Sequence, residues 1–78
     1  MRYYFDTDDG TGFIADDAGI DLYGMNEARL QAQAALADIA RDHVPAGGNE
    51  RTMTCRVRDE SGKAVLLASL VLTIEELP

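Results

Sequence analysis

Three aspartates near the start of the chain have a spacing that could bind a cation. Asp6, Asp8 and Asp17 occupy positions one, three and twelve of a loop of EF-hand length, and carboxylates are ligands that Ca²⁺ prefers. Position six of that loop is Thr11, where the sharp turn requires glycine, and position five is Gly10, which has no side-chain oxygen. We therefore expect an acidic, solvated turn here and no metal site.

The only histidine and the only cysteine are the other pair that could do chemistry. His43 and Cys55 could act as base and nucleophile only within hydrogen-bond reach, with a third group to orient them. We expect His43 in the last turn of a helix, where a cationic imidazole complements the helix dipole. Cys55 falls on the apolar face of a strand, where cysteine behaves as a small hydrophobic residue. Because no phosphate loop or Ser–His–Asp set occurs either, we predict a protein that is not an enzyme and needs no cofactor.

Basic side chains are concentrated in one stretch, at Arg51, Arg56, Arg58 and Lys63. This stretch could contact an acidic partner or nucleic-acid phosphates. The whole chain, however, has 14 acidic and 7 basic residues and a formal net charge of −7, whereas a phosphate-backbone binder needs an excess of clustered positive charge. We therefore predict solvated strand ends partly paired with neighbouring carboxylates, and no nucleic-acid partner.

Length and composition limit the chain to one domain. It has 78 residues, of which 46% are hydrophobic, so we expect a single folded domain over residues 1–78 with one modest core. Its longest apolar run, residues 64–68, is far short of the roughly 18 residues that span a bilayer, and no signal peptide is recognisable at the start. One cysteine excludes an internal disulfide, and an unpaired cysteine in a small fold is typical of a reducing compartment. We therefore expect a cytoplasmic protein with no membrane partner.

The first 22 residues favour extended structure. Residues 2–6 contain a cluster of aromatic side chains, which are common in strands. Residues 13–15 resume the extended pattern after an aspartate- and glycine-rich turn over 7–12. These segments predict a β-hairpin over 2–15, followed by a short extended segment over 20–22.

Residues 25–43 predict the single helix, since they contain no glycine or proline and many good helix formers. Either Gly24, with Glu27 at the third position, or Asn26 could cap its start. Residues 44–48 end the helix, because a residue that precedes a proline is pushed out of the helical region. One stripe of the helix is apolar enough to pack on a sheet. It comprises Met25, Ala28, Ala32, Ala35, Leu36, Ile39 and His43.

The C-terminal third predicts a second hairpin. Residues 52–58 alternate between apolar and polar, and residues 64–74 form a long apolar strand. A two-residue loop at 61–62 would align the apolar side chains and place Glu60 opposite Lys63. The aligned pairs would be Met53 with Leu70, Cys55 with Ala68 and Val57 with Leu66. A shift of one residue would lose this match, so we expect the register to be well determined.

The other face of this hairpin is the candidate site, because one helix can cover only one face of a sheet. The candidate interface residues are Thr54, Arg56, Arg58, Val65, Leu67, Ser69 and Val71. Aliphatic side chains flanked by threonine and arginine suit a sheet-to-sheet or edge-to-edge contact between copies. Alternatively, the strand simply has a high apolar content, since single exposed hydrophobic residues are normal.

Five short motifs, spread over essentially the whole chain, resemble a family of small bacterial proteins of unknown function. They are an aromatic-Phe-Asp start (2–6), an acidic glycine turn (8–10), an Asp-x-x-Gly-x-x-Leu run (16–22), a Glu-Ala-Arg helix segment (27–29) and a Val-Arg-Asp-x-x-Gly hairpin (57–62). The resemblance supports the fold and implies no activity. More distantly, the order of elements is similar to that of HicB-type antitoxin domains. Those domains typically carry a DNA-binding segment that this chain lacks, so the similarity implies at most a protein-binding half.

These patterns predict an α+β fold with two layers, in which one helix packs on one face of an antiparallel sheet in ββαββ order. We expect a non-enzymatic protein-interaction module that self-associates as a homodimer. The alternative is an antitoxin-like regulatory protein that binds a toxin or RNase partner. Whether the outer sheet face or an edge strand makes the contact stays open at this level.

Overall fold

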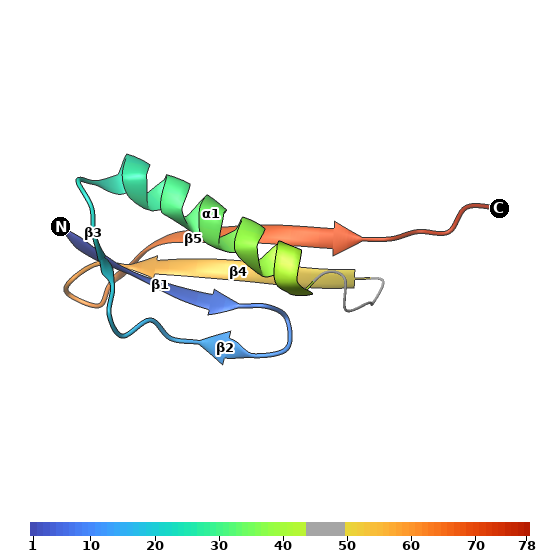
Figure 1. The fold of residues 1–78 in the computed structure, drawn as a ribbon, viewed down its shortest axis with the longest axis horizontal. Helices are drawn as coiled ribbons and strands as arrows, with labels where there is room; N and C mark the ends of the chain where they lie inside the picture. The colour runs from blue at the N-terminus through green and yellow to red at the C-terminus, as the bar shows by residue number, and fades with distance from the viewer. Residues whose placement is uncertain (44–49) are drawn as a thin grey trace.

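A single helix lies across one face of an antiparallel sheet (Figure 1). The computed structural model describes residues 1–43 and 50–78. In chain order the elements are β1 (Arg2–Asp8), β2 (Phe13–Ile14), β3 (Ile20–Asp21), α1 (Met25–His43), β4 (Glu50–Arg58) and β5 (Ala64–Thr73). The sheet has the order β2-β1-β4-β5, and the short β3 also pairs with β1. This arrangement confirms the predicted α+β fold.

β1 is the strand around which the N-terminal part of the sheet is built. On one side its residues 4–8 pair with β4. On the other side residues 7–8 pair with β2 and residues 2–3 pair with β3, which confirms the N-terminal hairpin and the short extended segment after it. The chain reverses at Gly10, whose φ of 94° is a conformation that glycine adopts without steric cost.

The helix α1 has the predicted bounds. The Ala28 N–H donates to the Gly24 carbonyl at 3.1 Å, so Gly24 is the N-cap and Asn26 lies inside the helix. The side chain of His43 and the predicted helix end over 44–48 lie outside the described part of the chain.

The buried stripe of α1 begins one turn later than the sequence predicts. Ala28 and Ala32 are completely buried, whereas Met25 is 41% exposed. The small alanine side chains allow the helix to lie close to β4 and β5, which are the strands that it mainly contacts. The core that results combines side chains of the helix, β1 and β4. It comprises Tyr3, Phe5, Ala28, Ala32, Leu36, Met53, Cys55 and Val57.

The hairpin of β4 and β5 has the predicted register over most of its length. Met53 faces Leu70, and Val57 faces Leu66. Next to the turn the register shifts, because Arg58 faces Ala64. One residue of β5, Val65, is therefore an extra residue in that strand, which is a β-bulge.

The predicted two-residue loop, with Glu60 opposite Lys63, is wrong. The Asp59 N–H donates to the Lys63 carbonyl at 2.9 Å, and the Gly62 N–H donates to the Asp59 carbonyl at 3.0 Å. The carboxylate of Asp59 also accepts the N–H groups of Ser61 and Lys63 at 2.9 and 3.1 Å. Because one aspartate satisfies several donors of the turn, the longer three-residue loop is favoured. The bulge then restores the apolar match further along the strands.

Candidate functional site

The sheet face opposite α1 holds most of the predicted interface residues. Thr54, Arg56 and Arg58 alternate along β4 with buried residues, so their side chains point away from the helix. On β5, Ser69 is exposed, Leu67 is 59% exposed and Val71 is 61% exposed.

Val65 is placed differently from its predicted neighbours. It is half-buried and packs against the core cluster. The reason is the bulge, which interrupts the strict alternation of faces next to Arg58. The exposed aliphatic part of the predicted surface therefore consists of Leu67 and Val71.

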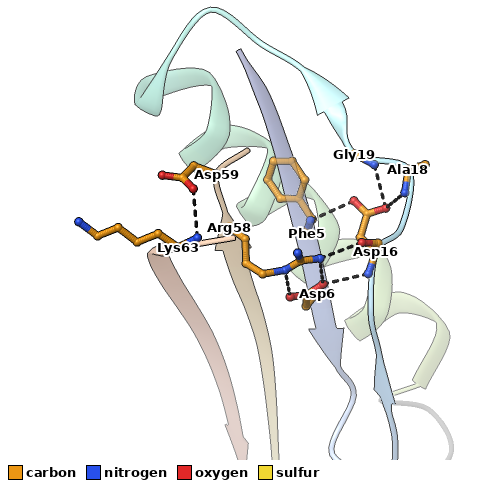
Figure 2. A network of polar contacts seen from close by, with 8 residues as sticks. All are labelled: Phe5, Asp6, Asp16, Ala18, Gly19, Arg58, Asp59 and Lys63. Carbon is orange, nitrogen blue, oxygen red and sulfur yellow. Dashed lines mark hydrogen bonds and ion pairs between the residues drawn. The ribbon is translucent and has the colours of Figure 1, made fainter. Parts of the chain in front are cut away.

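Arg58 is engaged within the chain. Its Nε and Nη2 donate to the two carboxylate oxygens of Asp6 at 2.6 and 3.0 Å, and Nη2 also donates to the Asp16 carbonyl at 2.8 Å (Figure 2). The guanidinium carbon lies 5.0 Å from the centre of the Tyr4 ring, in a cation–π contact. Through these contacts with Asp6, Asp16 and Tyr4, Arg58 links β4 to β1 and to the segment before β3.

Asp16 closes a gap in the pairing of β1. Between β2 and β3 the chain leaves β1, and the Asp16 carboxylate accepts the Phe5 N–H at 3.0 Å in place of a strand carbonyl (Figure 2). The Asp16 N–H in turn donates to Asp6 at 2.9 Å. The other oxygen of Asp16 accepts the N–H groups of Ala18 and Gly19 at 3.0 and 3.1 Å. This network therefore satisfies the backbone where regular pairing stops.

The network stabilises the ionised carboxylates. Hydrogen bonds from Arg58 hold the pKa of Asp6 below its ordinary value, although burial opposes this. For Asp16, burial raises the pKa, but the N–H groups of Phe5, Gly19 and Ala18 outweigh it, and the pKa is lowered. Sequence reasoning missed this network, because it treated Asp6 as part of a solvated turn. The signal was a carboxylate directly after three aromatic residues of a predicted strand, because a carboxylate that becomes buried needs a partner.

The acidic turn binds its own backbone. Asp8 accepts the Gly10 N–H at 2.8 Å, and Asp9 accepts the N–H groups of Thr11 and Gly12 at 2.8 and 2.9 Å. The carboxylate of Asp6, the first position of the calcium-loop spacing, accepts hydrogen bonds from the Arg58 side chain. Over residues 1–43 and 50–78, no three His, Cys, Asp or Glu side chains converge in a geometry that could hold a metal ion.

Cys55 is sealed in the core. It is completely buried, and burial raises the pKa of its thiol to about 11, with smaller contributions from the charges of Asp6 and Asp16. A thiol in this state is protonated at neutral pH and is a poor nucleophile. Its distance from the His43 imidazole lies outside what the structure describes.

One surface hollow, of about 480 Å³, lies between β3 and the start of α1. Its lining residues are Met1, Asp21, Leu22, Tyr23 and Glu27. Asp21 already accepts the N-terminal ammonium at 2.9 Å. The polar groups of the hollow are therefore two carboxylates, a phenol and the N-terminal ammonium.

The edge strand β5 is the most distinctive exposed feature. In the described part of the chain β5 pairs only with β4, so its other edge has no partner strand. Its ten residues, AVLLASLVLT, include no charged side chain, although charges and short length are the usual means by which proteins protect an edge. By contrast, the far edge of the sheet is formed by the two-residue strands β2 and β3. Figure 1 shows β5 running along one side of the sheet and continuing into the C-terminal segment.

The fold and this edge define a small α+β sheet protein with one open, uncharged edge strand. The family described as a domain of unknown function, DUF6894, matches residues 2–71. The chain therefore belongs to that family, as the resemblance to proteins of unknown function implied. No curated protein and no solved structure matches the chain significantly. No helix of the described residues is long and apolar enough to cross a membrane.

Proposed function

We propose that the protein is a non-enzymatic interaction module that self-associates through β5. The observation that carries the proposal is the open edge of β5, which is ten residues long and uncharged. Its backbone N–H and C=O groups can form a ladder with another strand, and such strand addition is a common mode of protein recognition.

The edge is a better contact than the outer face of the sheet. Packing two outer faces together would bury the exposed Arg56 of each copy near the Arg58–Asp6 pair. Burying a charge without a dedicated partner is costly. Pairing along β5 leaves Arg56 in solvent and brings together only uncharged side chains of the strand.

Catalysis and a cofactor play no part in this proposal. The thiol of Cys55 is buried and protonated, and Asp6 and Asp16 are occupied by structural hydrogen bonds. The proposed location is the cytoplasm, which suits an unpaired cysteine. The proposed partner is a second copy of the chain.

Light scattering at micromolar concentrations tests the proposal with a matched pair of variants. Val71→Lys places a charge on the β5 edge strand, and Leu30→Lys places one at a similarly exposed site on α1, since the two side chains are 61% and 64% exposed. We expect the wild type and Leu30→Lys to be dimers and Val71→Lys to be a folded monomer. A wild type that stays monomeric overturns the proposal, as does a dimer that Leu30→Lys disrupts and Val71→Lys does not.

The alternative, an antitoxin-like protein that binds a toxin or RNase, would offer the same edge to a foreign strand. No contact in the described residues favours it over self-association. A monomer that purifies in equal amounts with a small basic protein would replace the self-association proposal with this one.

A further inference from the structure

We propose that two copies pair antiparallel along β5 around a two-fold axis at Leu70, with Lys63 of each copy opposite Glu76 of the other. This inference rests on the proposed self-association and specifies its geometry. It joins two sheets into one continuous sheet of order β2-β1-β4-β5-β5-β4-β1-β2, which removes the open edge from both copies.

The hydrogen bonds of β1 show which backbone groups of β5 are open. The Phe5 N–H donates to the Asp16 carboxylate, so it points away from β4, and Phe5 and Val57 form a non-hydrogen-bonded pair. Val57 therefore directs its N–H and C=O groups toward β5, where it faces Leu66, the first residue beyond the bulge. Because these groups alternate in direction along a strand, the open groups belong to the odd-numbered residues of the stretch 67–73.

Symmetry and these open groups fix the register. A two-fold axis that relates neighbouring antiparallel strands stands perpendicular to the sheet, so facing residues come from the same face of each copy and the axis passes through a residue position. An axis at Leu70, the centre of the stretch 67–73, pairs this stretch with itself and uses every open group in it. An axis nearer the turn would set part of the stretch against the bulge at Val65, and one nearer the C-terminus would set part of it against residues beyond Thr73, where β5 ends.

The helix-side face of β5 is apolar but only partly covered. The apolar row along this face comprises Leu66, Ala68, Leu70, Leu72 and Ile74. The row of β4 beside it is completely buried at Met53, Cys55 and Val57, whereas Leu70 is 40% and Ile74 is 55% exposed. In the proposed register the row of one copy faces the same row of the other. A second copy therefore covers these side chains with aliphatic cross-strand pairs, which stabilise sheets.

The bulge decides which charges meet at the two ends of the joint. Because Val65 is an extra residue, residue 64 of one copy faces residue 75 of the other, and Lys63 faces Glu76. Neither of these charged side chains forms an ion pair within the described residues. Moving the axis by one residue in either direction would set Lys63 against an uncharged residue. Two copies with a net charge of −7 each repel each other, so this opposite-charge contact favours a second copy in this register.

The C-terminal segment is positioned for this contact. Glu50, the first residue of β4, faces Thr73, so residues 74–76 extend beyond the strand that pairs with β5. Figure 1 shows this segment continuing the direction of β5. In the proposed register residues 74–76 lie beside residues 63–66 of the other copy, and the exposed Ile74 gains a neighbour that its own chain does not provide.

A symmetric disulfide tests the position of the axis. In Leu70→Cys the two new thiols would face each other in a non-hydrogen-bonded pair, with Cα atoms about 4.5 Å apart, which is within disulfide range. In the same-face control, Leu72→Cys, the identical positions would be separated by four residues along the strands, about 13 Å at 3.3 Å per residue. Ser69→Cys tests the neighbouring register. The native Cys55 is completely buried and does not compete. We expect mild oxidation to cross-link Leu70→Cys nearly completely and both other variants far less.

A charge exchange tests the end contacts without changing the strand. We expect Lys63→Glu and Glu76→Lys each to raise the dimer dissociation constant by roughly two- to thirty-fold, the range for two exposed ion pairs. The double variant should return to near the wild-type value. Lys63→Glu combined with Glu75→Lys is the matched control, because it has the same net charge but residue 75 lies on the other face of the strand. We expect it to recover less.

These results separate the register from self-association itself. Stronger cross-linking through Ser69→Cys or Leu72→Cys than through Leu70→Cys overturns the register and leaves self-association standing. The same holds if Lys63→Glu leaves the dissociation constant unchanged, or if the two charge exchanges recover equally. A wild type that is monomeric throughout overturns both.

Discussion

The carboxylate of Asp6 and the guanidinium of Arg58 form a two-pronged ion pair, although 52 residues separate them in the sequence. Asp6 is only 5% exposed, and Arg58 also donates to the Asp16 carbonyl. The pair therefore joins the two hairpins and the segment before β3 in one network. Removing one partner leaves a charge with reduced solvation, which costs more than the intact pair contributes.

Replacing Asp6 with asparagine should destabilise the fold. The change keeps the size of the side chain but removes the charge that accepts both hydrogen bonds from Arg58, so we expect a loss of about 2 kcal/mol. Asp38→Asn is the control, since the Asp38–Arg41 pair is exposed and such pairs contribute less than about 1 kcal/mol. Urea unfolding followed by circular dichroism measures both. Equal losses in the two variants would contradict the structural role of Asp6.

Stability should fall in acid because of the same network. The pKa of Asp6 lies below its ordinary value of 3.8, through hydrogen bonds from Arg58, and that of Asp16 is also lowered. The folded chain therefore releases these protons more readily than the unfolded chain. The stabilisation is complete above the ordinary pKa and is lost as the pH falls through the lowered values. Urea midpoints measured from pH 6 downward should decline more steeply for the wild type than for Asp6→Asn, and parallel curves would contradict this.

The thiol of Cys55 should be unreactive in the folded protein. Burial raises its pKa to about 11, so little thiolate exists at pH 8 and reagents cannot reach it. We expect a disulfide reagent to modify Cys55 only after denaturant is added. An Ala37→Cys variant in a Cys55→Ala background should react at once, because position 37 is exposed on α1. Rapid modification of native Cys55 would show that the core opens readily.

Gly19 should not tolerate a side chain. Its φ is 73°, and a Cβ there would lie 2.9 Å from the Arg2 side chain and 3.0 Å from the Tyr3 carbonyl oxygen. We expect Gly19→Ala to lower the free energy of unfolding by about 1–3 kcal/mol. Gly12→Ala is the matched control, since nothing lies within 4 Å of its Cβ position, and it should be neutral or slightly stabilising. Similar thermal midpoints for the two variants would contradict the tight approach of residues 16–19 to β1.

Local patterns in the sequence were sufficient to predict the helix and strands and much of the strand pairing. The bounds of α1 follow from helix formers between a capping glycine and a proline, and the β4–β5 register follows from matched apolar alternation. The helix bounds and the hairpin register both depend on residues that are close in the sequence, so the periodicity of apolar residues predicts them directly. The prediction of the β4–β5 turn was wrong, because the Asp59 carboxylate satisfies several backbone donors of a longer loop. The alternation of apolar residues carries no information about these hydrogen bonds.

The sequence by itself therefore determined the elements, the α+β class and the apolar face of β4 and of β5 beyond the bulge at Val65. Only the tertiary structure decided that Asp6 is buried against Arg58 and Asp16 and that β5 lies at an open edge. The physical reason is that a buried charge needs a partner from a distant segment, and an edge exists only once the order of the strands is set. Neither is a property of any local stretch of residues. The candidate site, the uncharged edge of β5, depends on that order.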